Sequence, residues 1–161
     1  MGNPDSARQL LRHTVATLAY RGGKAVRGVP GAFGGFHVAN ESRMPVEILA
    51  HIGDLLAWAL SIASGKQQWS ASAPLPWPNE VDRFFALLDA FESYLASDAA
   101  LHATPEKLFQ GPIADALTHV GQIAMLRRLA GAPVRGENYH VANIAAGRVG
   151  ADQPAPVREF D

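Results

Sequence analysis

Apolar positions recur every three or four residues in four separate segments of the chain. This spacing places the apolar side chains on one face of an α-helix, where they can pack against other helices. The two clearest stripes comprise Ile48, Ile52, Leu55, Ala59 and Ile62, followed by Val81, Phe84, Leu88, Phe91 and Leu95. The pattern therefore predicts four amphipathic helices.

Capping and breaking residues set the expected bounds of these helices. The first helix is expected to begin at a cap at Asp5 or Ser6 and to stop at Gly22-Gly23, and the second to run from Pro45 to about Ser64. The third is expected to begin at a cap at Asn79, and the fourth to run from about Pro112 to Ala130. A short helical lead-in is expected at Thr104-Pro105, before the fourth helix.

Two long segments are expected to connect these helices. The Gly-rich stretch 21–40 has neither the phosphate-loop pattern nor a dinucleotide-binding fingerprint, so we interpret it as a connection in which Phe33 and Phe36 cover the core. The stretch 65–78, "GKQQWSASAPLPWP", is rich in Pro, Ser and Trp and cannot be helical throughout.

The whole pattern predicts an all-α protein. Alternating β-branched runs are nearly absent, so we expect at most a minor strand pairing. Four apolar stripes in a chain of 161 residues favour a four-helix bundle. We expect one domain over 1–161, with the bundle over about 5–131 and a tail over 132–161 that contains a short helical pattern from Asn138.

Composition narrows the possible partners and the compartment. The formal net charge of −1 gives no electrostatic reason to expect nucleic acid or an anionic membrane as a partner. The most apolar stretch, "ILAHIGDLLAWALSIA", contains His51 and Asp54 and is expected to be too short to span a bilayer. The N-terminal residues do not have the pattern of a signal peptide, so we expect a cytoplasmic protein. The chain has no cysteine, which excludes disulfides and protein thiolate ligands.

Three polar residues fall on or beside the apolar stripes. Asp115 and His119 are four residues apart, so they share one face of the fourth helix. His51 shares a face with Ile48 and Leu55 on the second helix. Buried polar groups need partners, and a metal ion between two helices would be a partner for both histidines. The alternatives are a simple hydrogen bond from His119 to Asp115 or to a backbone carbonyl, and a helix-dipole role for Asp115 in the first turn.

The register of the two histidines depends on topology. His51 lies six residues after Pro45 and His119 lies seven after Pro112. The two imidazoles would come out level if the second and fourth helices ran in the same direction. They would match less well if the helices ran antiparallel, unless these were staggered. The long Trp/Pro linker permits either course.

The residues around these positions resemble a known family. "PVEILAHIGDLLAWAL", followed much later by "THVGQIAMLRRLAGAPV", is similar to the DinB/YfiT-like four-helix metalloenzymes over roughly residues 6–133. In that family, a second-helix histidine joins two histidines of an H-x-x-x-H motif that is often followed by Gly-Gln-Ile. The resemblance matches His51 to the first of these, and His119, before Gly121-Gln122-Ile123, to the last. The other motif position is Asp115, which departs from the family pattern.

The resemblance implies a function. His51, Asp115 and His119 would hold a divalent metal, with nickel or zinc favoured, because a carboxylate can stand in for an imidazole ligand. The expected protein is a metal-dependent enzyme acting on a small-molecule substrate, either a transferase that uses a low-molecular-weight thiol as cofactor or a hydrolase. The competing interpretation is a non-catalytic dimeric binding or stress-response module with a weakened metal site.

Further residues have more than one interpretation. Family habit and the apolar residues Trp58, Leu60, Phe85 and Leu87 predict a homodimer. Several polar or aromatic residues could support the site, or could have ordinary roles in helix capping, solvation or hydrogen bonding. These are Glu47, Asp54, Gln122, His37, Tyr139 and His140. His37 and His140 could also be extra metal ligands, and Tyr139 and His140 lie in the tail.

Overall fold

The computed structural model describes residues 4–160 and confirms the all-α prediction. The main helices are α1 (Pro4–Val26), α2 (Pro45–Ala63), α3 (Trp77–Ala96), α4 (Pro105–Leu108) and α5 (Ala114–Leu129). The single turns η1 (Gly31–Gly35) and η2 (Phe109–Ile113) lie between them. In the tail, η3 (Tyr139–Val141) follows β1 (Gly136–Glu137), which pairs antiparallel with β2 (Glu159–Phe160).

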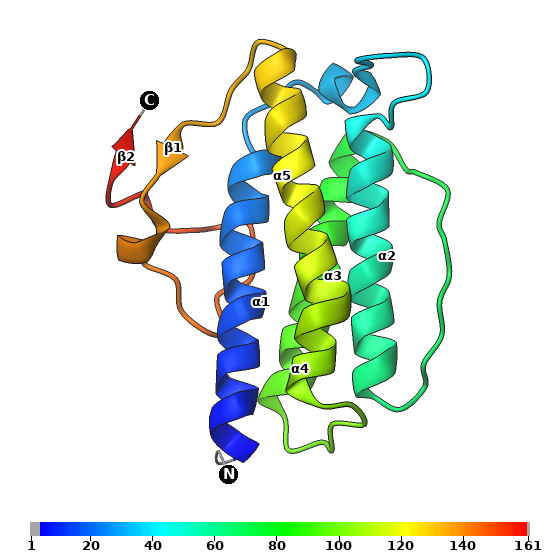
Figure 1. Cartoon of the computed structure of the whole chain (residues 1–161), viewed down its shortest axis with the longest axis vertical. Helices are drawn as coiled ribbons and strands as arrows, with labels where there is room; N and C mark the ends of the chain where they lie inside the picture. Colours follow the sequence, from blue (N-terminus) through cyan, green and yellow to red (C-terminus); the bar gives the residue numbers. More distant parts are fainter. Residues whose placement is uncertain (1–3, 161) are drawn as a thin grey trace.

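The four long helices form a bundle with a crossed-over connection (Figure 1). Helices α1 and α5 run upward in this view, whereas α2 and α3 run downward. The linker 64–76 therefore travels the length of the bundle, outside α2, before α3 begins. Helix α2 packs against both α3 and α5, and α1 packs against the same two helices. The candidate ligands on α2 and α5 thus belong to neighbouring, antiparallel helices.

The apolar stripes predicted from the sequence meet in the centre of the bundle. Ile52, Phe84, Leu88 and Phe91 are each at most 1% exposed. Phe33, in η1, closes one end of the core and packs edge-on against Trp77 with ring centroids 5.3 Å apart. The expected covering of the core by Phe33 and Phe36 is therefore confirmed, whereas residues 21–26 of the Gly-rich stretch belong to α1 and are not part of a connection.

Several predicted helix bounds were wrong. Helix α1 begins at Pro4 and continues past Gly22-Gly23, because glycine there allows close approach to α3: a Cβ on Gly22 would lie 2.6 Å from Phe84 Cζ. The chain turns instead at Gly28, which has a φ of 73°. Helix α3 begins at Trp77, two residues before the expected cap at Asn79, and α5 begins at Ala114, after η2, which contains Pro112.

The close contact at Gly22 leads to a stability prediction. Gly22→Ala should lower the free energy of unfolding by about 1–3 kcal/mol, because the methyl group overpacks a buried ring. Gly121 is the control: it lies in α5, and a Cβ added there would have no neighbouring atom within 4 Å, so Gly121→Ala should raise stability by about 0.5–1 kcal/mol through helix propensity. Urea denaturation of both variants checks this, and equal effects would contradict it.

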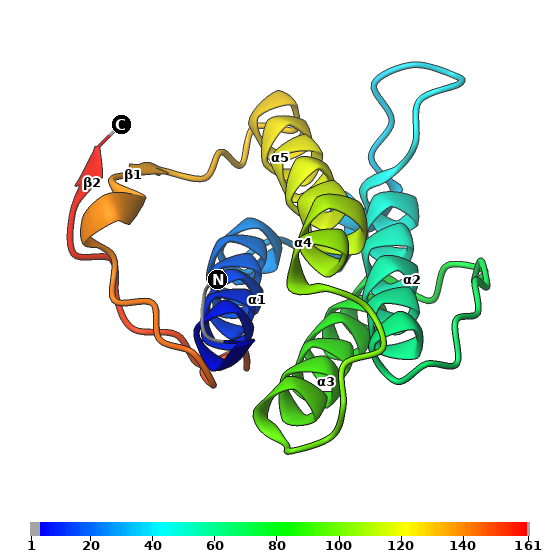
Figure 2. The ribbon, with the colours of Figure 1, turned by 60° about the horizontal axis from the view of Figure 1, so that its bottom comes forward.

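The tail lies along α1, on the side away from α2 (Figure 2). The helical pattern expected from Asn138 is limited to the three residues of η3. Buried ionic contacts hold the tail instead of a helix: Lys24 Nζ lies 2.7 Å from Glu137 Oε2 and 2.8 Å from Glu159 Oε1, and Tyr20 donates to Glu137 Oε1 at 2.6 Å. We call these four side chains the tail anchor.

The apolar composition of α2 has an explanation inside the bundle. By length and composition α2 could cross a membrane, which corrects the expectation that the segment is too short. However, 56% of the most apolar 18-residue stretch of α2 is buried within the protein. A core helix passes the same test of hydropathy, so the composition of α2 is accounted for by its packing.

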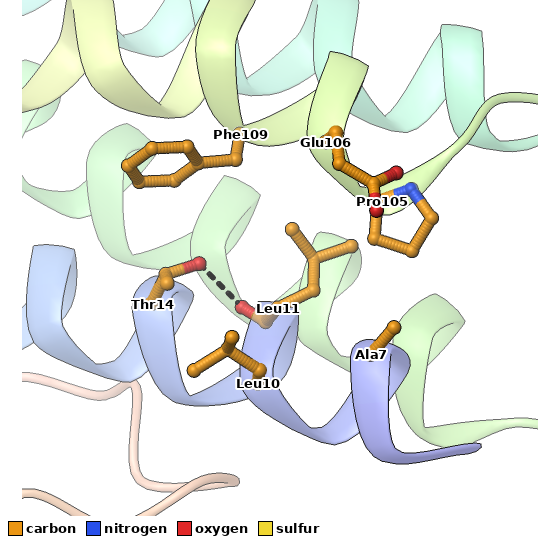
Figure 3. A pocket seen from close by; sticks show the side chains of 7 residues that line it. All are labelled: Ala7, Leu10, Leu11, Thr14, Pro105, Glu106 and Phe109. Carbon is orange, nitrogen blue, oxygen red and sulfur yellow. Dashed lines mark hydrogen bonds between the residues drawn. The ribbon is translucent and has the colours of Figure 1, made fainter. Parts of the chain in front are cut away.

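Exposed apolar side chains do not lie where the sequence analysis placed them. Trp58, Leu60, Phe85 and Leu87 are only partly exposed and pack against the core. An apolar groove lies instead between α1 and the α4–η2 turn, as Figure 3 shows. Leu10 and Phe109 in this groove are 65% and 44% exposed.

Candidate metal centre

Three potential ligands converge between α2 and α5. His51 comes from α2, whereas Asp115 and His119 come from successive turns of α5. One ligand atom from each lies within 4.8 Å of the other two. The Nε2 atom of His119 is 3.3 Å from Asp115 Oδ1, and the Nε2 atom of His51 is 3.8 Å from Asp115 Oδ2. Among residues 4–160, this is the group of histidines and carboxylates with the spacing of a metal site.

The two histidines are level because the antiparallel helices are staggered. His51 lies six residues after the start of α2 at Pro45, whereas His119 lies ten residues before the end of α5 at Leu129. The difference of four residues corresponds to about 6 Å along a helix. Helix α5 does project beyond the N-terminal end of α2 in Figure 1. The stagger considered in the sequence analysis is therefore present.

A hydrogen bond fixes the orientation of His119. Gln122 Oε1 lies 2.8 Å from His119 Nδ1. An amide oxygen only accepts hydrogen bonds, so this contact requires the proton to be on Nδ1. The neutral ring then directs the lone pair of Nε2 at a carboxylate oxygen of Asp115, which is also an acceptor. Two acceptors at 3.3 Å need a cation between or beside them, either a proton on the imidazole or a metal ion.

The site is buried on the histidine side and open on the carboxylate side. The side chains of His119 and His51 are 12% and 25% exposed, whereas that of Asp115 is 48% exposed. Burial is the main cause that lowers the pKa of His51; the neighbouring His119 and Arg43 lower it further, and Asp115 only partly offsets this. His51 is therefore neutral at pH 7, which is the form that binds a metal.

No family model, curated protein or solved structure matches the chain. The DinB/YfiT resemblance therefore stays a prediction. The functional argument depends on the geometry of these three residues and of their neighbours.

The surroundings of the site resolve several of the open interpretations. Glu47 accepts a hydrogen bond from the Met44 backbone N–H and so caps α2. Asp54 is buried and accepts from Arg83 Nη2 at 2.6 Å and from the Ser72 N–H, so it is neither exposed nor hydrogen-bonded to His51. Gln122 holds His119, a contact within one helix that the sequence analysis did not anticipate.

The tail residues and His37 lie outside the group of three ligands. His37 and His140 are exposed and are not part of it. Tyr139 packs edge-on against Tyr20 at 6.2 Å and beneath Arg21, on the α1 side of the bundle. The structure therefore gives no support to the suggestion that the tail covers the site.

Trp69 is the neighbour that sequence reasoning missed. Its ring centroid lies 5.8 Å from that of His51 and 5.7 Å from that of Trp58, both in edge-to-face arrangements. The pattern of the linker could show only that it was not helical. No local signal could place Trp69 beside a residue 18 positions earlier in the chain.

The lowered pKa of His51 predicts a pH dependence of stability. The folded pKa lies below the ordinary value of 6.5, so the unfolded chain binds more protons in acid. The stabilisation is thus complete above pH 6.5 and is lost as the pH falls through the folded pKa. In EDTA, His51→Asn should lose less stability between pH 7 and pH 5 than the parent. Urea denaturation measures this. His140→Asn serves as control, and an equal loss in parent and His51→Asn would contradict the assignment.

Proposed function

We propose that this protein is a divalent-metal-dependent enzyme of the DinB/YfiT type, with His51, Asp115 and His119 as the metal ligands. The observation that supports this most strongly is the convergence of the three ligand atoms within 4.8 Å across two helices. The 3.3 Å contact between His119 Nε2 and Asp115 Oδ1 is compatible with it, because a metal ion would satisfy both acceptors, as a proton on the imidazole also would. The assignment to the DinB/YfiT type depends in addition on the resemblance of the sequence motifs around His51 and His119.

The donor set fits zinc or nickel. Two imidazoles and one carboxylate are a common catalytic set, in which the protein supplies three ligands and the remaining position is open. The exposed side of Asp115 leaves room for a small molecule at that position. The absence of cysteine means that a thiol, if it takes part, arrives with a low-molecular-weight cofactor.

Each protein group then has a defined role. Gln122 keeps the proton of His119 on Nδ1 and so presents Nε2 to the site. His51 stays neutral through its burial, and Asp115 supplies the one negative charge. The metal supplies, when bound, the positive charge that lowers the pKa of a thiol or a water, so that a nucleophile exists at neutral pH. The reaction would be the transfer of a thiol to a small substrate, or hydrolysis.

The second candidate is a binding module without turnover. The half-exposed Asp115 favours it, because a carboxylate beside two histidines can also be a simple ion-pair cluster. Either version is proposed to be a cytoplasmic homodimer. The small apolar groove with the exposed side chains Leu10 and Phe109 is a surface that self-association could cover.

Metal analysis distinguishes the two candidates. For the enzyme we expect one metal per chain in protein purified without a histidine tag. The cobalt-loaded protein should also gain a sulfur-to-cobalt charge-transfer band when 2-mercaptoethanol is added, because the thiolate occupies the open position. Substoichiometric metal, together with thermal stability that a chelator does not change, would instead favour the binding module.

A further inference from the structure

The linker 64–76 brings an aromatic wall to the candidate metal centre. Trp69 lies edge-on against His51, and its other neighbour, Trp58, lies two helical turns beyond His51 on α2. Trp69 remains 47% exposed. A large part of an indole ring therefore faces solvent directly beside a metal ligand, where a bound molecule would cover it.

Hydrogen bonds on both sides of Trp69 hold the wall in place. The Ser61 hydroxyl bonds to the backbone N–H and C=O of Gln68, at 3.1 and 3.2 Å. Three residues after the tryptophan, the Ser72 N–H donates to the buried carboxylate of Asp54 at 2.9 Å. A wall fixed before a ligand arrives loses little conformational entropy on binding. The linker, although it has no regular secondary structure, would therefore hold Trp69 in place for binding.

A cleft leads away from the wall. Trp58 lines a cleft of about 790 Å³ together with residues that include Gly111 and Pro112. Pro112 lies one helical turn before Asp115, and Trp58 lies on the same face of α2 as His51. Its size is that of a small-molecule site. It is lined neither by Trp69 nor by any of the three candidate ligands, so Trp58 is the residue that it shares with the aromatic wall.

The charges of the centre select the ligand's head group. Two neutral imidazoles, one carboxylate and a divalent metal leave a net charge of +1. The nearby Arg43 adds to it, since its charge acts on His51, and the charge of Asp54 is neutralised by Arg83. An anionic oxygen or sulfur donor is therefore favoured over a neutral one.

We propose that Trp69, together with Trp58, forms the substrate-binding wall of this centre, and that the substrate is a small aromatic molecule with an anionic oxygen or sulfur donor. The donor occupies the open position of the metal, and the aromatic ring packs on the exposed face of Trp69. This inference rests on the proposed metal-dependent function. Trp69 would determine which substrate binds and would not itself bind the metal.

The test compares two probes that share donor atoms. Acetohydroxamate and benzohydroxamate both bind zinc through two oxygens, but only the second carries a ring. Zinc affinity is measured first, by competition with a chromophoric chelator, and hydroxamate affinity to the zinc-loaded protein is then measured by calorimetry. We expect benzohydroxamate to bind about tenfold more tightly than acetohydroxamate, because the contact of its ring with Trp69 should raise the affinity by about a factor of ten.

Variants assign the difference to Trp69. Trp69→Ala should keep the zinc affinity and the acetohydroxamate affinity and lose the preference for the ring, whereas Trp69→Phe should keep part of it. Leu75→Ala is the matched control, because Leu75 is on the same linker and is 46% exposed, and it should change nothing. If Trp69→Ala loses zinc, Trp69→Leu, which keeps an apolar contact with Trp58, replaces it.

The outcomes separate the two proposals. A parent protein that binds no zinc would overturn the proposed function and this inference with it. A parent that binds zinc but does not prefer benzohydroxamate, or a preference that survives removal of the Trp69 ring, would overturn only the aromatic wall.

Discussion

Alanine in place of His51 or His119 is expected to lower the zinc and nickel affinity of the protein by on the order of 100-fold or more. Loss of a residue that merely orients a ligand already costs about 10–100-fold, and each of these substitutions removes a nitrogen ligand itself. Competition titration with a chromophoric chelator gives the affinities. His140→Ala, in the exposed tail, is the control and should leave them unchanged.

Asp115 gives a graded version of the same prediction. Asp115→Asn should weaken binding less than the alanine variants do, since an amide oxygen remains but its charge is lost. Asp115→His would restore the family's H-x-x-x-H motif and should tighten zinc and nickel binding, because both metals favour imidazole. The metal-site assignment would be wrong if Asp115→His bound no better than the parent and His51→Ala bound no worse.

Glu137→Ala should cause the largest loss of stability, about 3–5 kcal/mol in the free energy of unfolding, because it breaks a buried ion pair. The side chain of Glu137 is fully buried, and it accepts from both Lys24 and Tyr20. Removal of this carboxylate leaves the Tyr20 hydroxyl without that hydrogen-bond acceptor. Lys24, which is only 8% exposed, keeps Glu159 as its one ion-pair partner among those two.

A surface pair in the same tail is the control for Glu137. Arg135 contacts Glu159 at 3.1 Å but is 65% exposed, so Arg135→Ala should cost at most about 1 kcal/mol. Urea denaturation at pH 7 measures both variants. A cost for Glu137→Ala no larger than that for Arg135→Ala would show that the tail anchor does not hold the tail to α1.

The fold was largely predictable because its main determinant is local. Apolar residues spaced three and four apart define a helix face, and burial of four such faces requires a bundle. Bounds set by packing were harder to predict. Gly22 looked like a stop because glycine usually weakens a helix, yet here the missing Cβ makes room for Phe84. Only the neighbouring helix decides between these two roles.

The candidate site was partly predictable for the same reason. Asp115 and His119 share a face through helix geometry alone, so their proximity follows from the sequence. A metal shared by His51 and His119 could be suggested from their apolar stripes, but the sequence could not show that the two side chains meet, because the direction and the stagger of α2 and α5 are tertiary properties. The structure brings all three together, while whether they bind a metal stays a prediction.

The remaining features depend on contacts between distant segments. Trp69 reaches His51 because Asp54 is buried and holds the linker at Ser72, and nothing in the linker itself indicates this. The tail is held by Lys24, which sits more than a hundred residues before Glu137. Such pairings leave no periodic signal in the sequence.

Zinc K-edge X-ray absorption of the zinc-loaded protein tests the metal centre most directly, since it reports the atoms bound to the metal. The proposed centre predicts one zinc per chain with two imidazole nitrogens at about 2.0–2.1 Å and further oxygen ligands, and one imidazole fewer in His51→Ala. A spectrum with oxygen ligands and no imidazole scattering, or one unchanged by His51→Ala, would contradict the claim that His51, Asp115 and His119 hold a metal.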